Sequence, residues 1–339
     1  MWGLGFAAPS VNLDRLSGDP TVSVGGLHSK ADVGAPLLQV AVGYRPNASP
    51  LRLSIVIVNY LAYDPLADCL ESLSRYLPSA DVVVVDHDTR VDLLEPLRAR
   101  FARVQFLTSR DNPGFAAGVN RGVRATTGDF ALLLNPDCVV TGDLLSVVSW
   151  LAAHPAAAVC GVLVREPDGS IQASARHFPG ITTGFAGRTS WLTRVWPNNP
   201  WSRKNLVRDV PGEPTEVDWV SGACMLVRRD AFAAVGGMDE QFFMYWEDAD
   251  LCRRLKQAGW ATYYSADASV IHLTGQSSRH AREASLVAFH ESAYRYYRKH
   301  GGWQAAVLAP AAFVMLQMRL RLQLARLRRA SGDRAKSDS

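Results

Sequence analysis

Cysteines are few in this sequence, and none of them forms a metal-binding or redox pair. The five cysteines among 339 residues are scattered, with no Cys-x-x-Cys spacing. Most lie in apolar runs, which is typical of reduced core thiols and favours a cytosolic protein over a disulfide-stabilised secreted one. A strong excess of charge is also missing, because the formal net charge is only +4. We therefore do not expect nucleic-acid binding.

The sequence also shows no pattern of a signal peptide, a membrane-spanning helix or a dinucleotide-binding motif. The N-terminus has no basic region followed by an apolar block, so we predict no signal peptide. No run of about 18 apolar residues occurs, so a membrane-spanning helix is not expected. No Gly-x-Gly-x-x-Gly motif follows a strand, which disfavours a NAD-binding domain.

Short apolar runs alternate with helical segments from residue 53 onward, which predicts a doubly wound α/β fold. Four of these runs are rich in β-branched or aliphatic residues and suit strands buried on both faces: 53–60, 82–85, 104–107 and 130–134. Between the first two runs, one helical face carries Leu66, Leu70, Leu73 and Leu77. Residues 1–50 show no periodicity, and we predict a loosely ordered extension with one short strand at Leu37–Val42.

The later segments continue the pattern. We predict a helix at 144–153, strands at 158–164, 217–228, 261–264 and 269–272, and a hairpin turn at Asp168-Gly169. From Arg176 to about Pro214, tryptophans, prolines and arginines alternate. That segment fits a cover over an acceptor site or a membrane surface, and a plain surface loop fits equally well.

Polar residues follow several strands, at the edge where such sheets bind ligands. Asn59 and Asp86 end the first two strands, and Asp137 follows the strand at 130–134 within Asn135-Pro136-Asp137. A carboxylate at this position can hold a divalent cation that grips a diphosphate, although solvated turns of this composition are common. His272 ends a later strand and can complete such a metal shell, while a structural role is the usual one for a lone histidine.

The acidic stretch 236–254 is the most unusual part of the chain. Aromatic residues lead into Glu247-Asp248-Ala249-Asp250, after which helical spacing begins and continues to Gly259. Carboxylates at a helix start are favoured by the helix dipole, and an acidic cap is the simpler explanation. We favour a catalytic role, because unpaired buried carboxylates in an apolar run would be costly.

The C-terminal tail combines an apolar stripe with arginines. Its stripe is Phe313, Leu316, Leu320, Leu324 and Leu327, and arginines such as Arg319 fall off it. A basic amphipathic helix of this kind suits the surface of an anionic membrane, and a dimer seam or docking on the core would give the same pattern. We divide the chain into an extension (1–50), a main domain (51–300) and this helical tail (301–339).

In their order, these blocks resemble glycosyltransferase family 2 enzymes of the GT-A fold, and most closely the bacterial rhamnosyltransferase-like branch. The matching stretches are 54–60, 83–86, 112–116, 132–137, 236–254, and His272 with Gly275 and Ser277. The resemblance implies a GT-A-type Rossmann-like mixed sheet flanked by helices. It also implies an inverting, metal-dependent transfer of a sugar from a nucleotide diphosphate to an acceptor hydroxyl.

The resemblance assigns roles to individual residues. Asp248 would be the general base with Glu247 beside it, and Asp137 and His272 would bind Mg2+ or Mn2+. The expected substrate-binding residues are Asn59, Tyr60, Asp86, Asn112, Gly114, Phe115, Asn135 and Trp246. Asp86 would contact the nucleoside base, and Asn135 would approach the ribose. The implied partners are dTDP-rhamnose or a similar donor, a lipid-linked or glycan acceptor, and the inner face of the plasma membrane.

The chain departs from the family pattern at two places. His87-Asp88 follows Asp86 where the family has Asn and a Ser-containing turn. The extra negative charge of Asp88 leaves open which nucleoside base the donor carries. Asn135 replaces the first acid of an Asp-x-Asp, so the metal would depend more on Asp137 and His272. Three alternatives stay open: transfer of another sugar such as galactofuranose or glucose, a catalytically silent sugar-nucleotide-binding scaffold, and, with less support, a nucleotidyltransferase.

Overall fold

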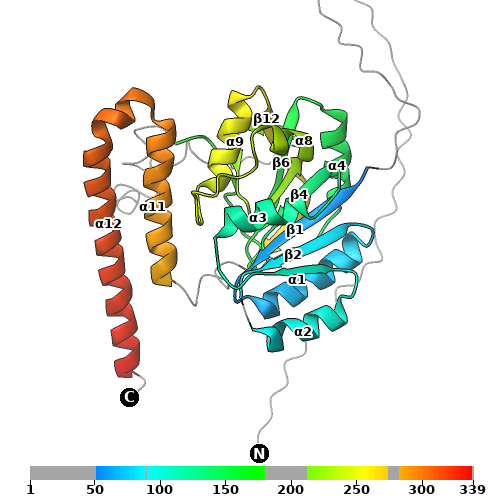
Figure 1. Ribbon diagram of the computed structural model, residues 1–339, viewed down its shortest axis with the longest axis horizontal. Coiled ribbons are helices and arrows are strands. Elements are labelled where there is room, and N and C mark those ends of the chain that lie inside the picture. Colours follow the sequence, from blue (N-terminus) through cyan, green and yellow to red (C-terminus); the bar gives the residue numbers. More distant parts are fainter. Residues whose placement is uncertain (1–50, 89, 180–211, 274–281, 338–339) are drawn as a thin grey trace, which may run out of the picture. The chain divides into compact units, whose positions relative to one another are not determined.

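The computed structural model describes residues 51–88, 90–179, 212–273 and 282–337 (Figure 1). The extension at 1–50 with its expected strand, most of the 176–214 segment, and the loop holding Gly275 and Ser277 lie outside these residues. Within them, one ten-stranded sheet has the strand order β3-β2-β1-β4-β11-β6-β12-β5, with β7 and β9 attached at its side. The α/β fold predicted from the sequence is confirmed.

The first half of the sheet is parallel. Its strands are β3 (Gln105–Thr108), β2 (Asp81–Asp86), β1 (Leu53–Asn59) and β4 (Phe130–Leu134). In β1, Ile55 and Ile57 join the core on one face, whereas Val56 and Val58 join the core on the other. This alternation explains why the strand has no polar face, because both of its sides are covered by helices.

Helices cover both faces of the sheet. On the face of Ile55 lie α1 (Tyr63–Tyr76), α2 (Val91–Arg100) and α4 (Leu144–Ala153). The opposite face carries α3 (Phe115–Arg124), α8 (Arg229–Ala234) and α9 (Glu247–Gln257). All four leucines of the predicted α1 stripe are buried, which confirms that pattern.

The second half of the sheet is mixed, and it corrects two predictions. The expected strand 217–228 is three strands: β9 (Thr215–Val217), β10 (Trp219–Val220) and β11 (Cys224–Arg228). The two strands expected at 261–264 and 269–272 are one, β12 (Ala261–His272), with an irregularity between Ser265 and Ser269. There the Ser265 hydroxyl bonds the backbone N–H of Asp267, so the polar residues form a bulge rather than a break.

The remaining strands bring distant segments to one edge. β6 (Ala157–Arg165) pairs with β11, β12 and β7 (Ile171–Gln172), which confirms the hairpin at Asp168-Gly169. β5 (Cys138–Val140) pairs antiparallel with β12, so that Cys138 faces His272. A small second sheet joins β8 (Ala175–Arg176) to β10.

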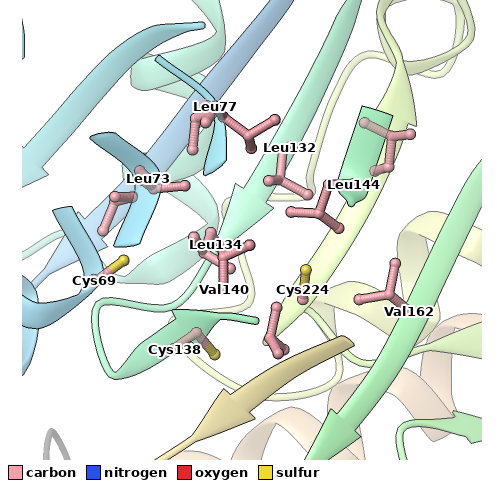
Figure 2. Packing of buried hydrophobic residues seen from close by; sticks show 14 of the residues in the cluster. Cys69, Leu73, Leu77, Leu132, Leu134, Cys138, Val140, Leu144, Val162 and Cys224 are labelled. Atoms are coloured by element: carbon pink, nitrogen blue, oxygen red, sulfur yellow. The ribbon is translucent and has the colours of Figure 1, made fainter. Parts of the chain in front are cut away.

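The cysteines belong to the core. All five are free and buried, which confirms the prediction of reduced thiols. Figure 2 shows Cys69, Cys138 and Cys224 among Leu132, Leu134 and other aliphatic side chains of the first core. Burial raises the pKa of Cys69 and Cys224, so both stay protonated at neutral pH.

A hairpin of two long helices ends the chain (Figure 1). α11 (Arg282–His300) is followed by α12 (Gly302–Ser337), which continues through Pro310. Of the predicted tail stripe, Leu320 is buried and Leu316, Leu324 and Leu327 are half-buried, while Phe313 stacks edge-on with Tyr294 of α11. The stripe therefore docks on α11, which is one of the alternatives that the sequence left open.

The structure also corrects the expectation about membrane-spanning length. Within the described residues, Gly302–Arg329 is long and apolar enough to cross a bilayer, with a mean hydropathy of 1.4 over its most apolar window. The helix escaped the sequence search because arginines and glutamines interrupt its apolar residues. Length and composition alone are weak evidence for crossing.

Candidate active site

The ends of β1 and β2 hold the first polar cluster. Asn59 and Asp86 are adjacent in the strand register, and the Asn59 amide donates to Asp86 Oδ1 at 2.7 Å. The Tyr63 hydroxyl donates to Asp86 Oδ2 at 3.1 Å. Burial raises the pKa of Asp86 in spite of these two bonds. The expected base-reading carboxylate is thus fully buried and bonded on both oxygens, while Tyr60 stays exposed.

The turn before α3 holds the second cluster of predicted site residues. Asn112 Oδ1 accepts from the Gly114 backbone N–H at 3.0 Å and lies 3.2 Å from His87 Nδ1. Gly114 has a φ of +97°, and a Cβ there would lie 2.3 Å from the carbonyl oxygen of Phe243. That carbonyl accepts from the Phe115 N–H at 2.7 Å. Only glycine therefore lets this turn press against the loop that leads to α9.

The third group is the candidate metal centre. His272 Nε2 lies 3.1 Å from Asp137 Oδ1, and the Asn135 amide nitrogen lies 3.4 Å from the same ring nitrogen. His272 Nδ1 lies 3.0 Å from Gln172 Oε1. The two expected ligands, from β12 and from the turn after β4, are therefore adjacent because β5 pairs with β12.

The chemistry of this group fits a divalent cation. With Nδ1–H donating to the glutamine oxygen, the assigned tautomer leaves Nε2 with a lone pair directed at a carboxylate oxygen. Two such acceptors in contact require a proton or a cation between them, and oxygen and imidazole suit Mg2+ or Mn2+. Cys138 also lies within reach, but its thiol donates to the Ala223 carbonyl within the core. The Asp137 oxygen and the His272 imidazole are therefore the candidate ligands.

The start of α9 presents a carboxylate held by the backbone. Asp248 Oδ2 accepts from the Gly222 N–H at 3.1 Å, and its Oδ1 accepts from its neighbour Ala249 at 2.7 Å. Its side chain is partly exposed. Burial raises the pKa of Asp248, with the two backbone donors and Arg176 opposing that effect. Such a carboxylate is oriented, accessible and more basic than an ordinary aspartate, as a general base requires.

Glu247 lies in a different environment. It is 5% exposed, and its Oε2 is buried without a hydrogen-bond partner. Burial, followed by the charge of Asp248, raises the pKa of Glu247 well above its ordinary value. A raised pKa favours the protonated, neutral form of Glu247, which suits it less than Asp248 to the role of proton acceptor.

One turn connects the metal centre to the acid on α9. The Gly222 N–H bonds Asp248, and the carbonyl of the next residue, Ala223, accepts from the Asn135 N–H at 3.0 Å. Asp137 follows two residues after Asn135. The Phe115 ring borders the same turn, 3.5 Å from where a Cβ of Gly222 would lie. Most of the predicted site residues therefore gather at one end of the sheet.

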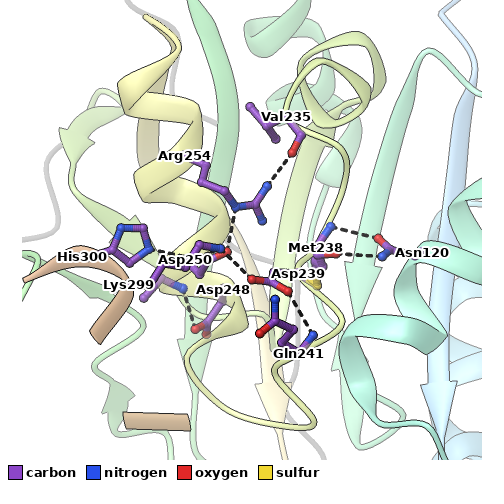
Figure 3. A network of polar contacts seen from close by, with 11 residues as sticks. Asn120, Val235, Met238, Asp239, Gln241, Asp248, Asp250, Arg254, Lys299 and His300 are labelled. Atoms are coloured by element: carbon purple, nitrogen blue, oxygen red, sulfur yellow. Dashed lines mark hydrogen bonds and ion pairs between the residues drawn. The ribbon is translucent and has the colours of Figure 1, made fainter. Parts of the chain in front are cut away.

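A polar network holds α9 and its preceding loop against α11 (Figure 3). Asp250, fully buried, accepts from Arg254 Nε, Lys299 Nζ and His300 Nε2, each at 2.7 Å. Lys299 also pairs with Asp239 at 2.7 Å. This network explains why the acidic stretch tolerates burial, because cations from α9 and α11 surround the carboxylate.

Aromatic packing completes the attachment. Trp246, expected to bind substrate, has its ring 5.2 Å from Tyr296 and 5.9 Å from Phe289, both on α11. Tyr245 and Trp246 both have a φ of +70°, in the left-handed region that side chains rarely adopt. The packing on α11 thus holds a strained backbone immediately before Glu247 and Asp248.

Sequence reasoning missed three contributors. Tyr63 reads as an ordinary first residue of a helix, and Gln172 lies in a two-residue strand that no pattern marks. Asp250 lies within the recognised acidic stretch, but two of its partners, Lys299 and His300, are in α11, and His300 is 50 residues away. A surplus of Arg, Lys and His at the end of α11 was the only available signal for that pairing.

Comparisons with known proteins show which family the chain belongs to. The family model for glycosyltransferase-like family 2 matches residues 50–286, more than half of the chain. The protein belongs to glycosyltransferase family 2. It is therefore a glycosyltransferase, and the resemblance drawn from its sequence is confirmed.

Two relatives fall in the rhamnosyltransferase branch. The N-acetylglucosaminyl-diphospho-decaprenol L-rhamnosyltransferase of Mycobacterium tuberculosis is 34% identical over 272 residues, covering 76% of this chain and 87% of the relative. Rhamnosyltransferase WbbL of Escherichia coli is 26% identical over 253 residues, covering 72% and 89%. Among solved structures, the mannosyltransferase of Pyrobaculum calidifontis in complex with GDP-Man and Mn2+ is similar in fold. Its TM-score is 0.50 at 13% identity, over 84% of this chain and 80% of that one.

Proposed function

We propose that this glycosyltransferase moves L-rhamnose from dTDP-rhamnose to a lipid-linked or polysaccharide acceptor in cell-envelope glycan synthesis, at the cytoplasmic face of the plasma membrane. The sugar and the acceptor class rest on the M. tuberculosis relative, whose name combines an L-rhamnosyltransferase with a diphosphodecaprenol that carries N-acetylglucosamine. WbbL is also named a rhamnosyltransferase. Transfer of galactofuranose or glucose on the same scaffold is the alternative that a donor assay distinguishes.

The arrangement of Asp248 and Asp137 around one turn is the observation that supports inverting transfer. The acceptor oxygen forms a bond to the anomeric carbon while the bond from that carbon to the diphosphate oxygen breaks. The hydroxyl proton passes to the Asp248 carboxylate, and the electron pair of the broken bond leaves with the diphosphate. A positioned carboxylate of this kind contributes about 10²–10⁴-fold in rate.

Asp137 and His272 would hold a divalent ion, whose charge offsets that of the departing diphosphate. Gln172 would keep the imidazole oriented through its contact with Nδ1. Asn135, which lies beside His272 Nε2, would approach the ribose of the nucleotide.

At the nucleotide end, we place the base over the exposed Tyr60, with Asn112, Gly114 and Phe115 along the adjoining turn. The buried Asn59 Oδ1 has no hydrogen-bond partner, so it offers an acceptor to an N–H of the base. The Tyr63 hydroxyl takes one lone pair of Asp86 Oδ2, so a base that contacts this buried carboxylate would bond it beside Tyr63.

A donor assay with the full-length protein tests the proposal. dTDP-rhamnose, UDP-galactofuranose and UDP-glucose are each supplied with a polyprenyl-diphosphate N-acetylglucosamine acceptor, with Mg2+, Mn2+ or EDTA. We expect transfer from dTDP-rhamnose only, loss of transfer in EDTA, and a product whose anomeric configuration is opposite to that of the donor. Preferred transfer from another donor, or retained configuration, would overturn the corresponding part of the proposal.

A further inference from the structure

Five apolar side chains form a stripe along the side of α12 that faces away from α11. Trp303, Val307, Val314, Met318 and Leu322 are between 56% and 76% exposed. Their spacing of four and seven residues places them on one helical face. This exposed stripe is opposite the Leu316–Leu320–Leu324 stripe, which docks on α11. An apolar face of this length on a water-exposed surface indicates that something binds there.

Arginines accompany the stripe, and α12 has no Asp or Glu before Asp333. Arg321 and Arg329 lie along the same helical face and Arg326 lies beside it, and all three are exposed. Among the residues whose side chains the structure describes, which end at Arg329 in this helix, no carboxylate pairs with any of these three. Their neighbour Arg328 pairs with Glu283 of α11 at 2.9 Å. A partner for this face must therefore supply negative charge together with apolar surface.

A second cationic feature lies between the two helices. Arg319 Nε and His290 Nε2 are both buried without a hydrogen-bond partner. His290 is 1% exposed, and its Nδ1 donates to the Leu286 carbonyl at 2.8 Å. Burial, and to a smaller extent the charge of Arg319, lower the pKa of His290. With Nδ1–H donating, the neutral His290 leaves Nε2 as an acceptor, so the buried donor without a partner is Arg319 Nε, whose charge adds to that of the exposed arginines.

We propose that this face of α12 docks onto a bilayer that contains anionic phospholipids. The apolar stripe would lie among the acyl-chain boundary atoms, and the arginines would contact lipid phosphates. This inference rests on the proposed function in that a lipid-linked acceptor requires the enzyme at the membrane. It names the docking surface, which differs from the stripe that the sequence predicted.

Two observations favour this occupant and this orientation. A second copy of the chain on the same face would offer Arg321 only an acid-free stretch of its own α12, because that helix has no Asp or Glu before Asp333. Crossing the bilayer is disfavoured because α11 runs beside α12, and the two-point contact of Arg328 with Glu283 would have to leave water. The helix therefore lies on the membrane and does not span it.

Flotation of the full-length protein with phosphatidylcholine vesicles, with and without phosphatidylglycerol, tests the proposal. We expect flotation mainly with the anionic vesicles, and its loss in Val314→Asp/Met318→Asp. The matched control Val91→Asp/Leu145→Asp changes two exposed apolar residues on α2 and α4 and should float normally. Arg321→Gln/Arg329→Gln should weaken binding to anionic vesicles roughly 30-fold, because each interfacial arginine contributes about fivefold.

Donor hydrolysis without vesicles separates this inference from the proposed function. We expect the stripe variant to hydrolyse donor as the wild type does, because α12 contributes no residue to the site. Unchanged flotation of the stripe variant would overturn the inference, and so would equal binding of the wild type to neutral and anionic vesicles. A wild-type dimer that the stripe substitutions dissociate would show that a second copy covers this face. Absent hydrolysis in the wild type would count against the proposed function alone.

Discussion

The carboxylate of Asp250 lies 2.7 Å from Nε2 of His300, and this contact joins the helix that carries Asp248 to the last turn of α11. Arg254 and Lys299 surround the same carboxylate. The Ser292 hydroxyl of α11 also donates to the Met244 carbonyl at 2.9 Å. α11 therefore holds both the start of α9 and the loop before it, although it lies outside the family-2 sequence blocks that identify the site.

Removing the negative charge of Asp250 should destabilise the protein at neutral pH. Burial alone would raise the pKa of Asp250, but hydrogen bonds from His300 and Lys299 and the charge of Arg254 lower it from 3.8 to about 2. Because the pKa of Asp250 is lower in the folded state, its ionised form stabilises the fold at pH values above the ordinary pKa. This stabilisation is lost as the pH falls from about 4 to about 2. We expect Asp250→Asn to lower the free energy of unfolding by about 2 kcal/mol at neutral pH.

Chemical denaturation across this pH range checks the prediction. The difference between wild type and Asp250→Asn should shrink as the pH approaches 2, since the wild-type carboxylate then becomes protonated. Asp92→Asn, an exposed aspartate in the first turn of α2, is the control and should change stability little. A difference that does not depend on pH would contradict the assigned ion pairs.

Asp248 and Glu247 should respond differently to amide substitution. Asp248→Asn removes the proton acceptor, so kcat should fall by about 10²–10⁴-fold. Burial raises the pKa of Glu247 and favours its protonated form, which Gln matches in shape, so Glu247→Gln should change kcat by less than about tenfold. Because burial raises the pKa of Asp248, the acidic limb of the kcat/KM profile should lie above the ordinary aspartate value of 3.8. Equal losses in both variants would contradict the division of roles.

Gln172 should affect metal affinity without contacting the metal. Its side-chain oxygen orients His272 through Nδ1, so Gln172→Ala should raise the Mn2+ dissociation constant about 10–100-fold. His272→Ala should have a larger effect, because it removes a ligand. Titration of the protein with Mn2+, followed by electron paramagnetic resonance, measures both without relying on activity. Wild-type affinity in Gln172→Ala would exclude the proposed orienting role.

Two glycines separate backbone strain from steric contact. Gly114 and Gly169 both have positive φ, but a Cβ at Gly114 would meet Phe243, whereas nothing lies within 4 Å of one at Gly169. Gly169→Ala should cost about 1–2 kcal/mol for the left-handed backbone. Gly114→Ala should destabilise the protein more and should also lower kcat, because Phe243 lies in the loop that leads to Asp248 at the start of α9. Similar stabilities and full activity in both variants would contradict the close contact.

Local patterns were sufficient for much of this fold. The buried strands β1, β2 and β4 and the helix α4 follow from continuous apolar runs and helical spacing. Glu247 and Asp248 were correctly placed at a helix start, because aromatic residues before them and Gly259 after the helix mark its limits. The positions of Asp137 and His272 also followed from strand ends.

Tertiary pairings were not predictable from such patterns. The contact of Asp137 with His272 depends on the pairing of β5 with β12, two segments about 130 residues apart. The burial of Asp86 depends on Tyr63, and the environment of Asp250 depends on α11. For α12, periodicity identified one apolar stripe correctly but could not show that α11 covers it and leaves a different stripe exposed.

A crystal structure of the protein with Mn2+ and dTDP-rhamnose tests the central claim most directly. We expect anomalous scattering from Mn2+ between Asp137 and His272. The anomeric carbon should lie between the diphosphate on one side and the Asp248 carboxylate on the other. A manganese peak away from Asp137, or an anomeric carbon whose free face points away from Asp248, would contradict the proposed mechanism.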